Sequence, residues 1–192
     1  MIKKERRTLM AIKQLIEGFL KELSKGEIEI YNEFSLQHEL GIYLRNHISS
    51  DYKVQFERNV SHFRISDTVK SEIDIVVLNQ KTNENYAIEL KFPLNGQYPE
   101  QMYSFVKDLK FMEELKEHGF THTYSLVIVS DSPFYQGDMQ TGIYKHFRKE
   151  HKIYGTIQKP TGQRNTSITI NQTYPFEWIS LGGGSKYYLI EV

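Results

Sequence analysis

The chain has 192 residues, with 24 basic and 24 acidic side chains and no cysteine. The absence of cysteine excludes a disulfide framework, a thiolate metal site and a cysteine nucleophile, and the balanced charge argues against a general nucleic-acid coat, so any contact with DNA is expected through a local patch. Its longest apolar runs are far too short to cross a bilayer, and the N-terminus lacks a signal-peptide core. These features predict a single cytoplasmic domain over residues 1–192 that does not enter a membrane.

Two amphipathic helices are predicted in the first quarter of the chain. Apolar residues recur at spacings of three and four over 8–23 and again over 33–47, where Asn32 is the expected cap. At about 100° per residue, Glu33 projects onto the apolar stripe of the second helix, while Glu39 lies roughly a quarter turn to its side. An acid facing a core is unusual. The alternative explanation is that Glu33 interacts with the positive end of the helix dipole.

Three strands are expected next. Residues 52–60 alternate well enough for a strand, at whose end Glu57 is expected to be solvated; the alternative is that it reaches the charged residues of the hairpin that follows. Over 71–93, two apolar and β-branched runs flank the polar septet NQKTNEN, a pattern typical of a β-hairpin. Asp74 lies on the first strand of this hairpin, and Glu89 lies on the second.

The hairpin carries three charged residues that require an explanation. Alternation places Glu89 and Lys91 on the same face, and the simplest register brings Asp74 to that face as well. Burying charges is costly unless they are paired or bind a metal. Two neighbouring carboxylates form a hard oxygen site suited to Mg²⁺ or Mn²⁺, and a lysine beside them can orient an attacking water or stabilise charge on a phosphate. The alternative is a surface ion pair between Glu89 and Lys91, which contributes little.

A third helix and a further strand follow the hairpin. The helix is predicted over 99–117, with a polar line of Gln101, Ser104 and Asp108 beside its apolar stripe. The run SLVIVS over 125–130 is typical of a buried central strand. A helix that crosses between two strands favours a sheet that is partly parallel.

The last third of the chain is less regular. A short helix is predicted over 143–152, and its basic face is either solvated or grips a phosphate backbone. The polar loop 162–165 is likewise either solvated or in contact with a phosphate backbone. Two strands over 167–174 and 186–192 are expected to extend the sheet.

Asp74, a gap of fourteen residues and then Glu89-Leu90-Lys91 on adjacent strands resembles the PD-(D/E)xK nuclease superfamily, which has the restriction-endonuclease-like fold. The order helix, strand, strand, strand, helix, strand is similar to the αβββαβ core of that family. Ile73 stands where the family name has proline, at a position that varies among members. The resemblance implies that Asp74 and Glu89 ligate Mg²⁺ or Mn²⁺, that the carbonyl of Leu90 adds an oxygen, and that Lys91 is the catalytic lysine.

The resemblance also extends to the helices. It implies that Glu33 is a further catalytic and metal-shell residue, with Glu39 as the second choice, and that Gln101 supports the lysine or a phosphate unless it is simply solvated. It implies an α/β fold in which helices flank a mixed central sheet. The expected parts are an N-terminal helix within 1–26, a catalytic core over 30–132 and a C-terminal β extension over 133–192.

The implied activity is the hydrolysis of DNA phosphodiester bonds by a Mg²⁺-activated water, in restriction, repair or defence. The alternative is a catalytically silent nuclease-like fold that binds DNA or a partner protein. Restriction-type enzymes tend to be dimers that match two-fold symmetric sites, so a homodimer is compatible with this analogy.

Overall fold

The computed structural model describes residues 11–162 and 166–192. The predicted helix start at Thr8 and residues 163–165 of the polar loop lie outside the described residues. The described chain forms a six-stranded sheet in the order β1-β2-β3-β4-β8-β7 and a two-stranded sheet of β5 and β6. The strands are β1 (Tyr52–Asn59), β2 (Glu72–Asn79), β3 (Asn85–Lys91), β4 (His122–Val129), β5 (Lys152–Gln158), β6 (Ser167–Pro175), β7 (Ile179–Gly182) and β8 (Ser185–Glu191).

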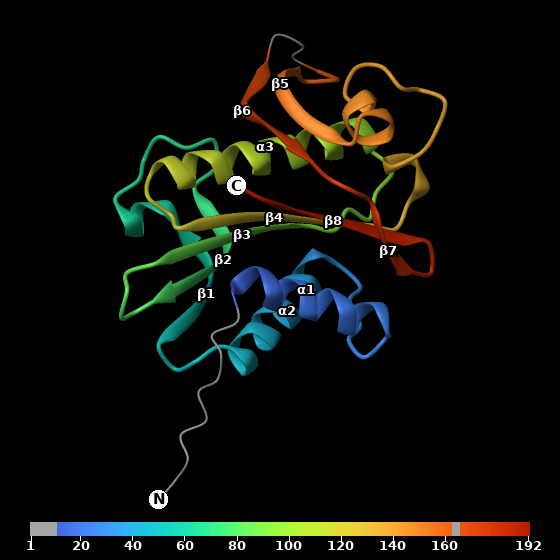
Figure 1. Cartoon of the computed structure of the whole chain (residues 1–192). Helices are drawn as coiled ribbons and strands as arrows, with labels where there is room; N and C mark the ends of the chain where they lie inside the picture. Colours follow the sequence, from blue (N-terminus) through green and yellow to red (C-terminus); the bar gives the residue numbers. More distant parts are fainter. Residues whose placement is uncertain (1–10, 163–165) are drawn as a thin grey trace, which may run out of the picture.

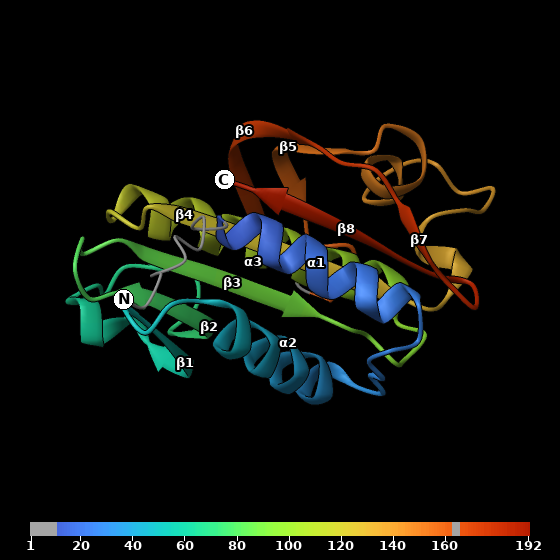
Figure 2. The same ribbon diagram turned by 60° about the horizontal axis from the view of Figure 1, so that its bottom comes forward.

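Three α-helices cover the two faces of the large sheet. They are α1 (Ile12–Ser24), α2 (Glu33–His47) and α3 (Tyr98–Glu117). Helices α1 and α2 lie side by side on one face, whereas α3 lies on the other face with the β5-β6 sheet beyond it (Figures 1 and 2). The protein is therefore a mixed α/β structure with helices on both faces of its sheet. Among the described helices, none combines the length and the apolarity that crossing a lipid bilayer requires.

The apolar core is divided by the sheet. On the α1 and α2 side, Leu36 and Leu40 of α2 pack with Ile88 and Leu90 of β3. On the other side, apolar residues of α3 pack against β4 and β8 and against the β5-β6 sheet. Because β3 and β4 are covered on both faces, almost every residue of these two strands is buried, as the continuous apolar run of β4 predicted.

Helix α2 has the bounds that the sequence predicted, and α3 begins one residue earlier than predicted, at Tyr98. At the start of α2, the side chain of Asn32 accepts a hydrogen bond from the Ser35 amide at 2.7 Å, and Ser35 Oγ accepts one from the Asn32 amide at 3.0 Å. This reciprocal cap satisfies amide groups that would otherwise have no partner in the first turn. In α3, Pro99 occupies the first turn, where its missing N–H costs nothing.

The large sheet contains both antiparallel and parallel strand pairs, as predicted from the helix that connects two of its strands. Strands β1, β2 and β3 are consecutive antiparallel neighbours. After β3 the chain crosses the sheet through α3 and returns as β4, which runs parallel to β3. The end of β3 and the start of α3 therefore lie at the same edge of the sheet, where Lys91 is placed.

The C-terminal third differs from the prediction. The expected helix over 143–152 is reduced to a single π-helical turn, Lys145–Lys149, and Lys152 instead begins strand β5. Of the two predicted C-terminal strands, β8 extends the large sheet, whereas β6 pairs with β5 in the separate small sheet. The expected basic face is also incomplete, because the half-buried Arg148 donates hydrogen bonds to the carbonyl of Pro133.

Glu113 fastens the small sheet to α3. Its side chain is 3% exposed, and Oε1 accepts hydrogen bonds from the amide of Asn171 at 2.9 Å and from the hydroxyl of Tyr174 at 3.1 Å. Lys110 lies 3.3 Å from Oε2. This buried carboxylate is therefore fully engaged with donors of β6 and of its own helix, which is a structural role.

Replacing Glu113 with alanine is expected to lower the free energy of unfolding by about 3–5 kcal/mol, because the half-buried ammonium of Lys110 and several donors of β6 lose their buried acceptor. Urea unfolding measures the loss. The control is Glu117→Ala on the same helix, at an exposed side chain, which is expected to change stability by less than about 0.5 kcal/mol. Equal losses in the two variants would contradict the assignment.

Candidate active site

Two carboxylates meet where β2 and β3 separate. The β2-β3 ladder runs from Leu78 opposite Asn85 to Ile75 opposite Ile88. One position further on, Asp74 Oδ2 accepts a hydrogen bond from the amide of Leu90 at 2.8 Å, and Glu89 Oε1 accepts one from the amide of Asp74 at 3.2 Å. Side chains thus replace backbone carbonyls as acceptors at this point, which satisfies the amides and locks each carboxylate against the opposite strand.

The neighbouring strand β1 is distorted at the same level. Its ladder with β2 includes Phe56 opposite Ile75 and Arg58 opposite Ile73 but omits the pair of Glu57 and Asp74 between them. Glu57 has φ of 47°, in the left-handed region. A non-glycine residue held there costs about 1–2 kcal/mol, and such strain is often found at functional sites.

A cleft lies between this distortion and the start of α2. It has a volume of about 170 Å³ and is lined by Glu33, Phe34, Gln37, Glu57, Asp74 and Leu90. Gln37 of α2 donates hydrogen bonds to the side chain of Glu57 and, at 2.8 Å, to the carbonyl oxygen of Asp74. Glu57 is exposed, as expected, and its bond with Gln37 holds its side chain at the cleft beside Asp74.

Lys70 joins the cluster from the loop that precedes β2. Its ammonium group is bonded to Glu89 Oε2 and lies 2.8 Å from Asp108 Oδ1 of α3. Both acids are buried, with exposed fractions of 1% for Glu89 and 2% for Asp108. A half-buried lysine that bridges β3 and α3 therefore forms one side of the site.

Lys91 occupies the other side. Its Nζ lies 3.1 Å from Glu33 Oε1 and 3.4 Å from Asp108 Oδ2, and it donates a hydrogen bond to the carbonyl of Leu90 at 3.1 Å. Glu33 is held in turn by the amide of Phe92 at 3.1 Å. The start of α2, the end of β3 and the middle of α3 thus converge on a single ammonium group.

The cluster carries more negative than positive charge. Four carboxylates, from Glu33, Asp74, Glu89 and Asp108, surround the two ammonium groups of Lys70 and Lys91, which leaves a net charge of −2 when all are ionised.

The pKa values respond to this crowding. Burial raises the pKa of Asp74 to about 6, against the opposing effects of Lys70, the Leu90 amide and Lys91. Burial, together with the charges of Asp74 and Asp108, raises the pKa of Glu89 well above its ordinary value. For Lys70, burial lowers the pKa, but Asp108 and Glu89 outweigh it and raise the pKa above the usual lysine range. The site therefore favours additional positive charge.

Four of the residues predicted from the sequence come together: Asp74, Glu89, Lys91 and Glu33. Of the two helix acids, Glu33 is the one that contacts Lys91. Gln101 lies apart from this contact, in the first turn of α3, where its amide donates to Asn95 Oδ1 at 2.9 Å in an exposed pair.

The prediction did not include Lys70 or Gln37, and it gave a place of Glu57 at the site only as an alternative. Asp108 was recognised only as part of a polar line on α3. The signal for Asp108 was present, because it lies on the line that begins at Gln101. Lys70 had no such signal, since it lies in a loop without periodicity.

The donor atoms at this site are suited to a magnesium or manganese ion. Asp74 Oδ1 makes no hydrogen bond within the described residues, and Asp108 Oδ2, which is buried, makes none there either, although Lys91 Nζ lies 3.4 Å from it. The oxygens of Asp74, Glu89 and the Leu90 carbonyl are hard ligands of the kind that Mg²⁺ prefers. In the described part of the chain, no three acidic or histidine side chains converge closely enough to hold an ion together. The set that the resemblance implies has only two carboxylates and one carbonyl, so an ion held by it would complete its shell with water, as Mg²⁺ commonly does.

Comparisons with known proteins give no relative for this chain: no protein-family model, no curated protein and no solved structure matches it.

Proposed function

We propose that the protein is a Mg²⁺-dependent deoxyribonuclease of the PD-(D/E)xK type with a restriction-endonuclease-like fold. The observation that carries the proposal is the meeting of Asp74 and Glu89 where β2 and β3 separate, with Lys91 bonded to the carbonyl of Leu90, the residue whose amide binds Asp74. The element order also supports it, since α2, three antiparallel strands, α3 and the parallel strand β4 follow the αβββαβ pattern.

Each residue of the site has a role in this proposal. Asp74, Glu89 and the Leu90 carbonyl would hold the metal. When bound, Mg²⁺ supplies Lewis-acid stabilisation of the phosphate and lowers the pKa of a coordinated water. Lys91 lies on the Leu90 carbonyl at the edge of these oxygens, where its ammonium group stabilises negative charge on the phosphate and orients the attacking water. Glu33 positions Lys91 through the contact at 3.1 Å.

The proposed reaction is an in-line displacement at phosphorus. The water oxygen forms a bond to phosphorus and loses its proton to solvent, and the bond from phosphorus to the leaving sugar oxygen breaks. The leaving oxygen then takes up a proton from solvent. The carboxyl groups at this site are buried and have raised pKa values. A cation compensates their negative charge, so that they stay ionised beside the phosphate. The reaction is therefore expected to require the metal.

The second candidate is a nuclease-like fold that binds DNA or a protein without cutting. It is favoured by one observation: Lys70 and Lys91 already pair with Glu89, Asp108 and Glu33, so that each of these acids has an internal partner. A module of this kind would show no change of melting temperature with Mg²⁺ or Mn²⁺, whereas an occupied site stabilises the folded state by mass action.

Incubation with supercoiled and linear DNA distinguishes the two candidates. We expect nicking or degradation in the presence of Mg²⁺ or Mn²⁺ and none in EDTA, read on an agarose gel. A parallel RNA substrate tests whether DNA is the preferred polymer. Intact DNA in both metals, with an unchanged melting temperature, would contradict the nuclease and support the binding module.

A further inference from the structure

We propose that Lys70 is an internal counter-cation that occupies Glu89 in the metal-free protein and leaves it when a divalent ion binds. The inference rests on the proposed function and deepens it, because it identifies which of the two lysines has to move. Lys70 Nζ contacts Glu89 and lies 2.8 Å from Asp108 Oδ1. It thus provides positive charge at the same carboxylate that the metal would use.

Competition for Glu89 follows from how its oxygens are engaged. Oε1 accepts the amide of Asp74 at 3.2 Å, and Oε2 is bonded to Lys70. Because Glu89 is 1% exposed, almost no carboxylate surface remains open to another ligand. An ammonium group and a divalent cation also repel each other strongly in a site of low dielectric constant. Metal binding through Glu89 therefore requires the contact with Lys70 to break.

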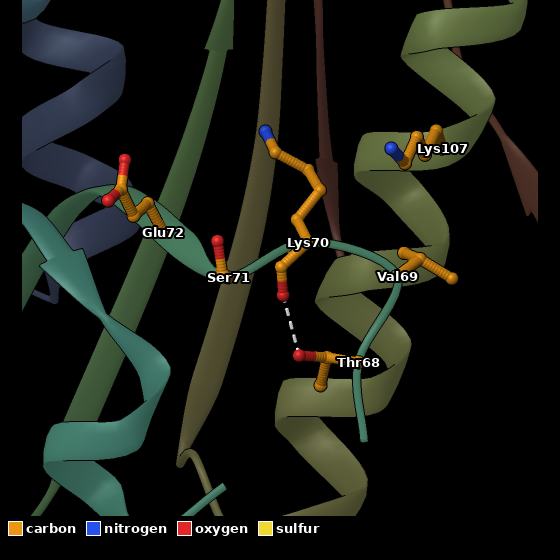
Figure 3. Close-up of a pocket in the computed structure, with 6 residues that line it drawn as sticks. All are labelled: Thr68, Val69, Lys70, Ser71, Glu72 and Lys107. Carbon is orange, nitrogen blue, oxygen red and sulfur yellow. Dashed lines mark hydrogen bonds between the residues drawn. The ribbon is translucent and has the colours of Figure 1, made fainter. Parts of the chain in front are cut away.

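The surroundings of Lys70 allow this movement. Lys70 lines an open depression of about 470 Å³ with Thr68, Val69, Ser71, Glu72 and Lys107. Figure 3 shows Lys70 on the loop before β2 and Lys107 on α3, on opposite sides of this depression. The side chain has space to turn toward solvent, where its ammonium group regains hydration.

Lys91 is held differently. It contacts Glu33, Asp108 and the Leu90 carbonyl together, and none of these contacts involves Glu89. When Lys70 leaves, Asp108 keeps Lys91 as its partner. The two lysines are thereby assigned different roles: Lys91 remains in place, and Lys70 exchanges with the metal.

The test compares Lys70→Met with Lys107→Met, a matched change in the same depression at an exposed lysine. Mn²⁺ affinity is measured by electron paramagnetic resonance, and melting temperature is measured in EDTA and in MnCl₂. Lys70→Met is expected to bind Mn²⁺ roughly 5- to 150-fold more tightly than wild type, the usual range for coupled ligands. It is also expected to melt at a lower temperature in EDTA and to gain more from Mn²⁺. Lys107→Met is expected to match wild type in both measurements.

The outcomes separate this inference from the proposed function. If wild type binds Mn²⁺ and Lys70→Met binds it with the same affinity, the exchange is overturned while the nuclease proposal stands. If wild type binds no Mn²⁺ and cuts no DNA, both proposals fail.

A measurement on wild type covers the case in which Lys70→Met does not fold. The lysine side-chain ¹⁵N resonances are followed during a titration with Mg²⁺, with Lys70 assigned by Lys70→Arg and Lys91 by Lys91→Arg. We expect the Lys70 signal to shift to a solvent-exposed position or to disappear through exchange with water, while the Lys91 signal persists. A Lys70 signal that is unchanged at saturating Mg²⁺ overturns the proposal.

Discussion

Replacing Lys91 with methionine is expected to lower the rate of Mg²⁺-dependent DNA cleavage by roughly 10²–10³-fold, the usual cost of removing one preorganised charge that stabilises a transition state. Methionine retains most of the aliphatic length of the side chain, so the change chiefly removes the ammonium group beside the Leu90 carbonyl. Single-turnover cleavage with enzyme in excess measures the chemical step, and thermal melting verifies that the variant is folded.

Two further variants make this result specific. Lys107→Met removes a positive charge from the exposed surface of α3 and is expected to leave the rate within about twofold, as is usual for surface changes away from the site. Lys91→Arg keeps the positive charge but changes its shape, and is expected to recover only part of the rate. Undiminished cleavage by folded Lys91→Met would remove Lys91 from the proposed chemistry.

Replacing Asp74 with asparagine is expected to stabilise the metal-free protein at neutral pH, by up to about 3 kcal/mol. The pKa of Asp74 rises from 3.8 to about 6 on folding, mainly through burial. The folded protein therefore binds this proton more tightly than the unfolded chain does. The stability contributed by the protonated group is complete below about pH 4 and is lost as the pH rises through about 6. Each pKa unit corresponds to about 1.4 kcal/mol.

Asparagine avoids this loss because it is neutral at every pH. Its side-chain oxygen also retains an acceptor for the amide of Leu90, the bond that Asp74 makes at 2.8 Å. The same change removes a metal ligand, so the variant is expected to gain no stability from Mn²⁺ and to lose cleavage. A residue that costs stability in the free protein and is needed for activity shows the usual trade-off between the two.

Urea unfolding in EDTA at a series of pH values measures this effect. The difference between Asp74→Asn and wild type should grow from about pH 4 to about pH 6 and then remain constant. Asp51→Asn is the control, since Asp51 forms an exposed pair with Lys81 and such pairs contribute little. A variant less stable than wild type at pH 7 would contradict the raised pKa.

The elements around the site were predictable because their signals are local. The cap at Asn32 and the spacing of apolar residues define α2. Alternation along β3 and a short polar turn define the register that brings Asp74 to Glu89. Because side chains alternate between the two faces of a strand, Lys91 is expected on the same face as Glu89. This explains why three charged residues of one hairpin could be grouped from the sequence.

Contacts between distant segments were not predictable in the same way. Lys70 reaches Glu89 because a loop without periodicity packs against α3, and Asp108 reaches Lys91 because α3 crosses the sheet at one particular angle and rotation. Both contacts depend on tertiary packing, which no local pattern encodes. The exposed position expected for Arg148 was wrong for the same reason, since its carbonyl acceptor, Pro133, lies in the short 3₁₀ helix Ser132–Phe134.

The central claim is that the carboxylates of Asp74 and Glu89 collect a divalent ion beside Lys91. Anomalous diffraction at the manganese edge, from crystals grown with Mn²⁺, tests this most directly. The expected result is a peak within coordination distance of both carboxylates and the Leu90 carbonyl, with Lys70 turned away from Glu89. A map without a peak there, in which Lys70 still contacts Glu89 at saturating Mn²⁺, would contradict the claim.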